Sequence, residues 1–208
     1  CTSIQAQIVS SRSVGITSTP KQPSETQWFL RGGLNFMGMA GDDTDDLSKK
    51  LGYNFVVGFQ KPMGSLGAYW GMEYGLGSRG YKYEEKDYDY DFNLITHNLQ
   101  VSPFTFGWKY GITDAIKIDA HVGAFVAFDY AGKIKVKVGD EEESFSMGDW
   151  EDDLEIDWQR FDTGMNIGVG IWYDRFNLDF TYQRGFMEVL KDSENYSSNF
   201  MIRLGVTF

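Results

Sequence analysis

The chain has 208 residues, enough for one domain or at most two small ones, and it is rich in glycine and aromatic residues but poor in proline. Acidic residues outnumber basic ones by 30 to 19, and a formal net charge of −11 argues against nucleic-acid binding, which needs clustered Lys and Arg side chains. No stretch supplies the roughly 20 apolar residues of a membrane-spanning helix, and a single Cys with two His makes a zinc site improbable, so we predict no cofactor and no resident metal.

Residues 1–26 have neither helical nor strand periodicity, and we interpret them as an export remnant or a periplasmic tether. Two export interpretations compete. Either Cys1 is the lipidated first residue of a mature lipoprotein, or Ile4-Gln5-Ala6 is the end of a signal peptide. Both interpretations place the chain outside the cytoplasm. A chain boundary without biological meaning is the third alternative.

Residues 27–208 divide into eight segments in which apolar and polar residues alternate, the pattern of strands with two different faces. The last segment is the clearest, because one face carries Phe200, Ile202, Leu204, Val206 and Phe208 and the other carries Asn199, Met201, Arg203, Gly205 and Thr207. Near Pro103 the alternation slips by one residue. This slip predicts a β-bulge there, because Pro cannot donate to a strand ladder and one inserted residue reverses the two faces.

The connections between these segments are of two kinds. Residues 61–65, 111–115 and 174–175 are short and rich in turn residues, whereas residues 41–50, 84–94, 138–157 and 191–198 are charged and mostly longer. The four charged connections hold 21 of the 30 acidic residues. Because the two kinds alternate along the chain, we expect all the long loops to emerge at one end of the sheet.

The composition of the two faces indicates the solvent that each one meets. The polar face consists mainly of Gly, Asn, Asp, Arg, Thr and Gln with few Lys, which suits a narrow interior better than a solvated exterior. The apolar face is larger than one small core requires. We therefore predict an all-β fold, an eight-stranded antiparallel up-and-down transmembrane β-barrel of the bacterial outer membrane with its apolar face toward lipid. A soluble β-barrel is the alternative.

Four stretches together resemble the PorT-like outer-membrane β-barrel proteins of Bacteroidetes: Gly33-Leu34-Asn35-Phe36, Leu99 to Tyr110 with its central Pro103, Gly164 to Gly170, and Leu204-Gly205-Val206-Thr207-Phe208. The resemblance covers nearly everything after Gln27, and it lies in the order and spacing of these stretches. It implies an outer-membrane barrel with both termini periplasmic. It also implies that Phe208 is an insertion signal for the barrel-insertion machinery. It implies no activity.

Ten charged or titratable residues fall on the face that we expect to point into the lumen: Arg31, Glu73, Arg79, Asp119, His121, Asp129, Arg160, Asp162, Asp179 and Arg203. Eight strands leave room for side chains but not for a channel, so opposite charges should pair and fill the lumen. The functional alternative is a narrow proton or ion path through these groups.

A barrel enzyme would need a His near the outer rim with a carboxylate and a Ser or second acid within hydrogen-bond reach. His97 is the one His at that height, with Thr96, Ser102 and Asp91 near it in sequence, while His121 lies nearer the other end. No second catalytic element stands at a recognisable spacing. We therefore predict no catalytic residue, and we keep a lipid- or peptide-modifying enzyme as an alternative.

The acidic connections also raise the question of cation binding. Asp87, Asp89 and Asp91 have the spacing of a calcium loop, but Phe92 stands where the turn Gly is needed and Asn98 replaces the bidentate Glu, so an EF-hand is rejected. Looser divalent-cation binding is the alternative to plain solvated loops for two groups: Asp42, Asp43, Asp45 and Asp46, and Asp149, Glu151, Asp152 and Asp153.

The tyrosines between these acids suit a contact surface. We predict a loop contact surface made of Tyr83, Tyr88, Tyr90, Asp149 and Trp150. The sequence thus predicts a small closed outer-membrane barrel with a structural or binding role. Its expected partners are outer-membrane lipid and lipopolysaccharide, divalent cations, a glycan, or another outer-membrane or surface protein.

Overall fold

The computed structural model describes residues 25–41, 47–64, 66–85, 90–139, 141–150, 157–190 and 194–208. The strands in chain order are β1 (Gln27–Gly41), β2 (Leu47–Ser48), β3 (Lys50–Pro62), β4 (Ala68–Glu85), β5 (Tyr90–Gly111), β6 (Ile116–Val138), β7 (Glu141–Ser146), β8 (Phe161–Tyr173), β9 (Phe176–Glu188) and β10 (Asn195–Thr207). Met147–Asp149 form a 3₁₀ turn, η1, and Trp150 directly after it also has α-helical backbone angles.

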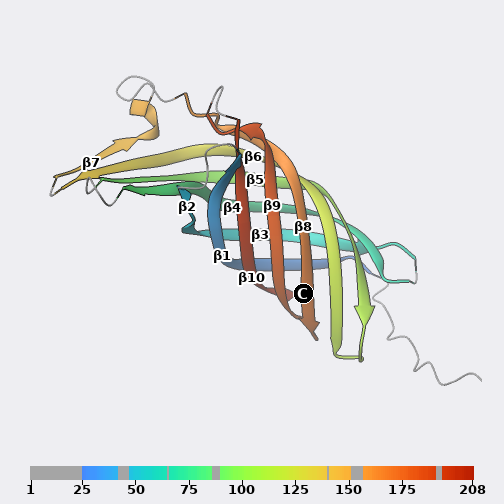
Figure 1. Cartoon of the computed structure of the whole chain (residues 1–208). Coiled ribbons are helices and arrows are strands. Elements are labelled where there is room, and N and C mark those ends of the chain that lie inside the picture. Colours follow the sequence, from blue (N-terminus) through green and yellow to red (C-terminus); the bar gives the residue numbers. More distant parts are fainter. Residues whose placement is uncertain are drawn as a thin grey trace, which may run out of the picture.

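Eight long strands close into a ring (Figure 1). The order is β1-β3-β4-β5-β6-β8-β9-β10, every neighbouring pair is antiparallel, and β10 pairs back with β1. The closing pair is in register from Phe29 opposite Thr207 to Gly41 opposite Asn195. The predicted eight-stranded antiparallel barrel is confirmed. Closure leaves the ring without a free edge, the condition for a sheet that lies in hydrocarbon.

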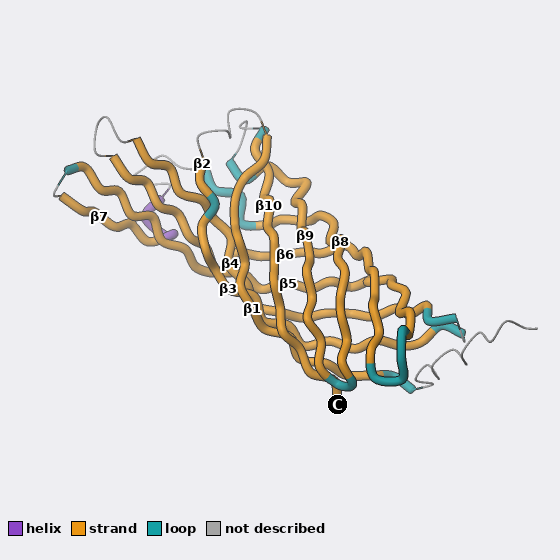
Figure 2. Tube along the Cα trace, turned by 60° about the horizontal axis from the view of Figure 1, so that its bottom comes forward, coloured by secondary structure: helices purple, strands orange, loops and turns teal. Residues whose placement is uncertain are grey.

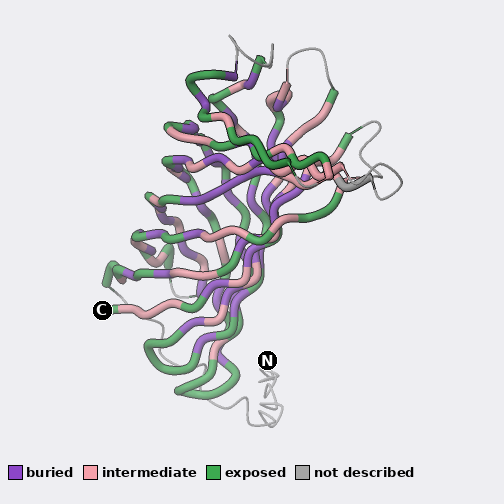
Figure 3. The backbone as a smooth tube through the Cα atoms, turned by 90° about the vertical axis from the view of Figure 1, so that its left-hand side faces the viewer, coloured by how far each residue is buried: buried purple, intermediate pink, exposed green. Residues whose placement is uncertain are grey.

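The two faces of the wall are distributed as the alternation predicts (Figure 3). Along β8, for example, Met165, Ile167 and Val169 are exposed while Asp162 and Asn166 are buried. Exposed large apolar side chains cover the outside of all eight strands, and most of the buried side chains inside the ring are polar or charged. A soluble barrel has the opposite arrangement.

The bulge predicted near Pro103 is present. The register of β5 against β6 shifts between Val101 and Phe104. On the other side of the same stretch of β5, the register of β4 shifts between Gly71 and Glu73. A second shift lies between His97 and Asn98 of β5, opposite residues 129–131 of β6. Below this shift the odd-numbered residues of β6 face inward, and above it the even-numbered ones do. Asp129 and Ile134 therefore both point to the inner side of the sheet.

Three strands continue past the ring and form a projecting sheet, which we define as residues 78–85 of β4, 90–96 of β5 and 131–138 of β6 together with β7. Figure 2 shows this sheet reaching beyond the barrel at the end opposite the C-terminus. β7 pairs with β6 along its whole length, and β2 pairs with β4. The expectation that 84–94 and 138–157 are simply loops is therefore wrong in part, because Tyr90–Leu94 and Glu141–Ser146 are strand.

The ends of the barrel differ as expected. The connections after β3, β5 and β8 lie at the end where the last strand finishes, and the turn between β8 and β9 consists of Asp174 and Arg175, with Asp174 at a φ of 53°. The projecting sheet and η1 lie at the other end. No helix among the described residues has the length and apolar character needed to cross a membrane.

The outward apolar side chains allow a test of the solvent that surrounds the wall. Ile167 is 61% exposed near the middle of β8. In a lipid-facing wall, Ile167→Lys should lower the free energy of unfolding by about 2–4 kcal/mol, measured by urea titration of Trp fluorescence in phospholipid vesicles. The control is Ile112→Lys, which is 56% exposed beside a short turn and should change the free energy much less. Equal effects of the two substitutions would contradict a hydrocarbon environment.

Candidate functional site

The lower half of the lumen holds one connected ion-pair network. Arg203 from β10 donates two hydrogen bonds to Asp179 Oδ1 of β9, at 2.8 Å from Nε and 2.6 Å from Nη2. Arg31 Nη1 lies 3.0 Å from Glu73 Oε1 and 3.8 Å from Asp179 Oδ2. His121 Nε2 lies 3.6 Å from the same Asp179 oxygen. The network therefore joins five strands across the barrel, and it is buried from solvent.

A second group of side chains extends this network toward the end with the short turns. The Tyr69 hydroxyl donates to Asp119 Oδ2 at 2.5 Å, and Trp172 Nε1 donates to Asp119 Oδ1 at 3.2 Å. Lys109 Nζ lies over the Trp172 ring, 3.8 Å from its centroid. The Lys109 ammonium also donates to Gln27 Oε1 at 3.4 Å, and a cation over an aromatic ring is attracted to the face of that ring.

The middle of the lumen is filled by amides and hydroxyls instead of charges. Asn166 donates to Ser102 at 3.2 Å, Gln183 donates to Asn166 at 3.0 Å, and Asn199 donates to Gln183 at 3.1 Å. This chain of side chains crosses the barrel from β5 through β8 and β9 to β10. It fixes the distance between these strands, because each hydrogen bond satisfies a polar group that has lost contact with bulk water.

A third group closes the lumen at the projecting end. Arg79 Nη2 lies 2.7 Å from Asp129 Oδ2, and Arg79 Nη1 lies 3.0 Å from Asp162 Oδ2. Trp158 Nε1 donates to the same Asp129 oxygen at 2.8 Å, and the Arg79 guanidinium lies 5.3 Å from the Trp158 ring centroid. Ser197 donates to Asp162 at 2.6 Å. A bulky indole therefore covers the last ion pair.

The sequence placed most of these residues correctly. Nine of the ten predicted lumen residues are buried, whereas Arg160 is exposed, so that prediction is wrong for Arg160. Arg160 precedes β8, and its carbonyl accepts a hydrogen bond from the Asp129 backbone outside the regular ladder. Sequence analysis missed Lys109, which is 5% exposed. The bulge at Pro103 was the signal for it, because residues 105, 107 and 109 face inward after the shift.

The projecting sheet has a small hydrophobic core of its own. Its buried members are Leu94, Ile134, Met147, Trp150, Trp158 and Val189. Trp150 and Trp158 meet edge to face with centroids 5.7 Å apart, and Trp150 Nε1 donates to the Phe145 carbonyl at 3.2 Å. Tyr81 packs against this core, and burial raises its pKa to about 12. We call the projecting sheet, η1 and this core together the cap; Trp158 belongs both to the core and to the group that closes the end of the lumen.

The predicted contact surface is only partly assembled. Tyr83 and Tyr90 lie together near the tip of the projecting sheet with ring centroids 6.3 Å apart, and Asp149 is exposed in η1. Trp150 is 1% exposed, so its assignment to the contact surface is wrong: the side chain is part of the core of the cap. Tyr88 lies outside the described residues.

His97 lies on the outer side of the wall. Its Nδ1 is 2.9 Å from the Tyr53 hydroxyl, its ring stacks on Tyr53 at 5.7 Å, and the Tyr130 ring lies 6.5 Å away. Thr96 and Ser102, the hydroxyls near it in sequence, are buried on the opposite, inner face. The structure therefore places His97 and these two hydroxyls on opposite faces of the wall.

The acidic groups considered for cation binding are mostly outside the described residues. Residues 42–46, 86–89 and 151–156 belong to that undescribed part, and Cys1 does as well. Within the described ranges, no group of three or more His, Cys, Asp or Glu side chains is arranged to hold a metal ion.

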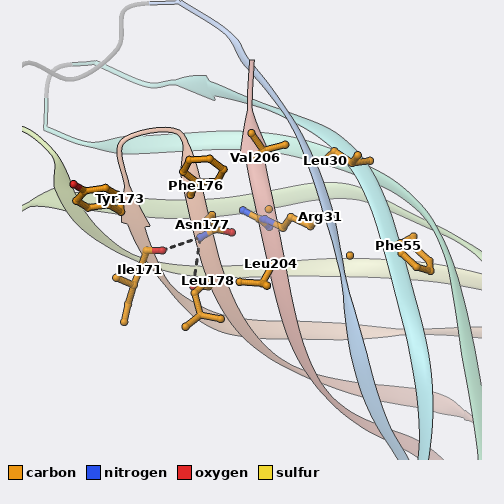
Figure 4. A pocket seen from close by; sticks show the side chains of 12 residues that line it. Leu30, Arg31, Phe55, Ile171, Tyr173, Phe176, Asn177, Leu178, Leu204 and Val206 are labelled. Carbon is orange, nitrogen blue, oxygen red and sulfur yellow. Dashed lines mark hydrogen bonds between the residues drawn. The ribbon is translucent and has the colours of Figure 1, made fainter.

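The outer wall carries shallow apolar grooves. One of them, shown in Figure 4, lies between β1, β3, β8, β9 and β10, where Gly32 leaves space beside Leu30, Phe55 and Leu204. Two others lie between neighbouring strands of the same wall. All three are lined almost wholly by the apolar residues that cover the rest of the exterior, so they are features of the lipid-facing surface.

Comparison with known proteins gives a family and several related folds. Residues 5–191 match the family model described as outer membrane protein beta-barrel domain. Ail of Yersinia pestis, solved in complex with the heparin analogue sucrose octasulfate, is similar at 16% identity over 88% of this chain and 99% of that chain, with a TM-score of 0.43. No protein with a curated description matches the chain.

Two further solved structures are similar at the same level. Neisserial surface protein A has 12% identity over 88% of this chain and 99% of that chain, with a TM-score of 0.45. OprG of Pseudomonas aeruginosa has 10% identity over 89% of this chain and 97% of that chain, with a TM-score of 0.49. The assignment to a family rests on the family model, which spans most of the chain.

Asp179 is the residue on which the lumen network converges, because Arg203, Arg31 and His121 all lie within 4 Å of its carboxylate. Asp179→Asn should lower the free energy of unfolding by about 3–5 kcal/mol, the cost of leaving a buried charge without its partner. Urea titration of the refolded barrel measures this change. The matched control is Asp174→Asn in the exposed turn before β9, which should change the free energy by less than about 0.5 kcal/mol.

Proposed function

The chain belongs to the outer membrane protein β-barrel domain family, and from this premise we propose that it is a closed outer-membrane barrel whose role is structural or binding. Its external cap meets a partner protein, a glycan or divalent cations. Outer-membrane lipid and lipopolysaccharide surround the wall. The observation that carries the proposal is the filled lumen, in which two charged layers and an amide layer lie below a tryptophan-covered end.

The filled lumen supports a binding role over a channel. Four basic side chains and five carboxylates are buried inside the described part of the barrel. In the lower network and in the Arg79 group, these side chains contact each other or aromatic rings directly. An ion that passed through would have to separate these pairs, at a cost that grows in a low-dielectric interior. The chain therefore offers a partner its outer surfaces and not its interior.

The cap supports a preformed contact surface. Tyr83 and Tyr90 stand on strands that are fixed by backbone pairing and by the cap core, so binding a partner requires little ordering of the chain. Tyr side chains combine an apolar ring with a hydroxyl, and they are enriched in protein contacts. Asp149, exposed in the neighbouring η1, adds a carboxylate to the same end of the molecule.

Within the family, the PorT-like barrels of Bacteroidetes remain the group that we propose as kin, on the four sequence stretches that resemble them. The same proposal places both termini in the periplasm, with Phe208 as the insertion signal. In support, Phe208 lies at the end with the short turns, where its backbone N–H donates to the Trp28 carbonyl at 3.0 Å. Lipidation of Cys1 remains a prediction from the sequence.

The proposal includes no reaction. His97 points away from Thr96 and Ser102, and its contacts are with the Tyr53 and Tyr130 rings on the outer wall. Tyr rings such as these are typical of the boundary between hydrocarbon and head groups.

The contact surface is tested by affinity capture from detergent-solubilised outer membrane. The full chain should retain a companion in fixed stoichiometry, and Tyr83→Ser/Tyr90→Ser should reduce its recovery at least tenfold, because the variant removes both rings at the tip of the cap. Thr113→Ser/Asp114→Ser, in a turn at the opposite end, is the matched control and should leave recovery unchanged. A companion retained equally by all three proteins would contradict the assignment of the surface.

The closed lumen is tested by recording across planar bilayers. The purified barrel should give no current steps above the background of protein-free bilayers, because its charged layers are paired and its end is covered by Trp158. Discrete steps that scale with salt concentration would favour the narrow channel instead.

A further inference from the structure

The outer face of the projecting sheet carries a row of lysines. Lys133, Lys135 and Lys137 alternate along β6, and all three are exposed. They lie on the side opposite Ile134, which is buried in the cap core. This side is continuous with the lipid-facing wall. Phe128 and Tyr130 point outward below the register shift near Asp129, and the lysines point outward above it.

Two more lysines converge on the same face. Asn93 of β5 stands in register with Lys82 of β4 on one side and with Lys135 of β6 on the other. Lys50 Nζ, from the start of β3, donates to Asn93 Oδ1. Burial lowers the pKa of Lys50, and the nearby positive charges of Lys135 and Lys82 lower it further. We call these residues, Lys50, Lys82, Lys133, Lys135 and Lys137, the lysine face.

The charge of this face is opposite to that of the whole chain. Among its described side chains, two carboxylates accompany the five lysines: Asp91 lies 3.2 Å from Lys82, and Glu142 lies 2.6 Å from Lys135. Glu84 of β4 stands in register with Asp91 and brings a third acidic residue to this face. Five lysines still outnumber three acidic residues there, whereas the whole chain carries −11. Positive charge gathered on one side of an acidic protein creates a local field that attracts anions.

The height of the lysine face relates it to the membrane. Directly below it on the wall are the rings of Tyr53, His97 and Tyr130, the kind of side chains that mark the boundary of the hydrocarbon. Lys133 follows Tyr130 by three residues, or roughly 10 Å along a strand at about 3.3 Å per residue. A strand tilted by about 40° rises roughly 7–8 Å over that length. Lys133 therefore lies at the outer part of the head-group zone, which is roughly 5–8 Å thick on each side of the hydrocarbon.

We propose that the lysine face binds the phosphate groups of anionic lipid head groups in the leaflet that surrounds the projecting end of the barrel. Lipid is favoured over a soluble anion because the face continues the apolar wall without a break, so a lipid whose acyl chains lie on the wall presents its head group to the lysines. Lysine is a suitable ligand, because its ammonium binds phosphate as a point charge. This inference does not depend on the contact surface formed by Tyr83 and Tyr90.

The test measures lipid binding by native mass spectrometry of the full chain in detergent. The probes are bisphosphorylated lipid A and the same glycolipid without its phosphates. The unmodified chain should bind the phosphorylated form at least tenfold more tightly. Lys133→Gln/Lys135→Gln/Lys137→Gln should remove that preference, whereas the corresponding triple substitution to Arg should keep it. Glu142→Gln should tighten binding at least twofold, because it releases Lys135 from its carboxylate.

The matched control is Lys61→Gln/Lys117→Gln, which removes two lysines at the opposite end of the barrel and should leave the affinity within twofold. Unboiled and boiled samples are compared by gel mobility to show that each variant is folded. The proposal is overturned if the triple Gln variant binds phosphorylated lipid A as the unmodified chain does, if both glycolipids bind equally, or if inorganic phosphate alone binds as tightly as the lipid.

Discussion

The structure depends on the requirement that every backbone N–H and C=O in hydrocarbon must find a partner within the protein. A sheet meets this requirement only when it closes, and here the pairing of β1 with β10 removes the last two free edges. Closure then fixes the rest: apolar side chains face lipid, and the polar side chains on the other face are confined to a lumen only eight strands around. They must satisfy one another.

The interior shows how that confinement is resolved. Charges are sorted into two layers, one around Asp179 and one around Asp129, and the space between them is bridged by amides. Each charged layer also contacts aromatic rings, such as Trp172 beside Lys109 and Trp158 beside Arg79. Opposite charges placed side by side hold neighbouring strands together, and the rings exclude water from them.

The barrel could be predicted from the sequence because a side-chain period of two is a local property that neighbouring residues reveal. Even the bulge at Pro103 was visible as a slip in this period. The cap could not be predicted in the same way. Its strands carry many charges on one face, so residues 84–94 and 138–157 resembled loops. The burial of Trp150 depends on a core that includes Val189 and Leu94, which are far from it in sequence. The prediction that Arg160 points into the lumen failed for a related reason, because Arg160 precedes the regular strand β8.

The closing pair of strands also has a consequence for biosynthesis. Phe29 in the first strand pairs with Thr207 in the last, and each long strand between them pairs with its two neighbours in the ring. The sheet keeps exposed edges until residues 195–207 have been synthesised and have paired with β1. Until that pairing forms, the open sheet presents edges that can pair with strands of other molecules, so the unclosed chain is prone to aggregate.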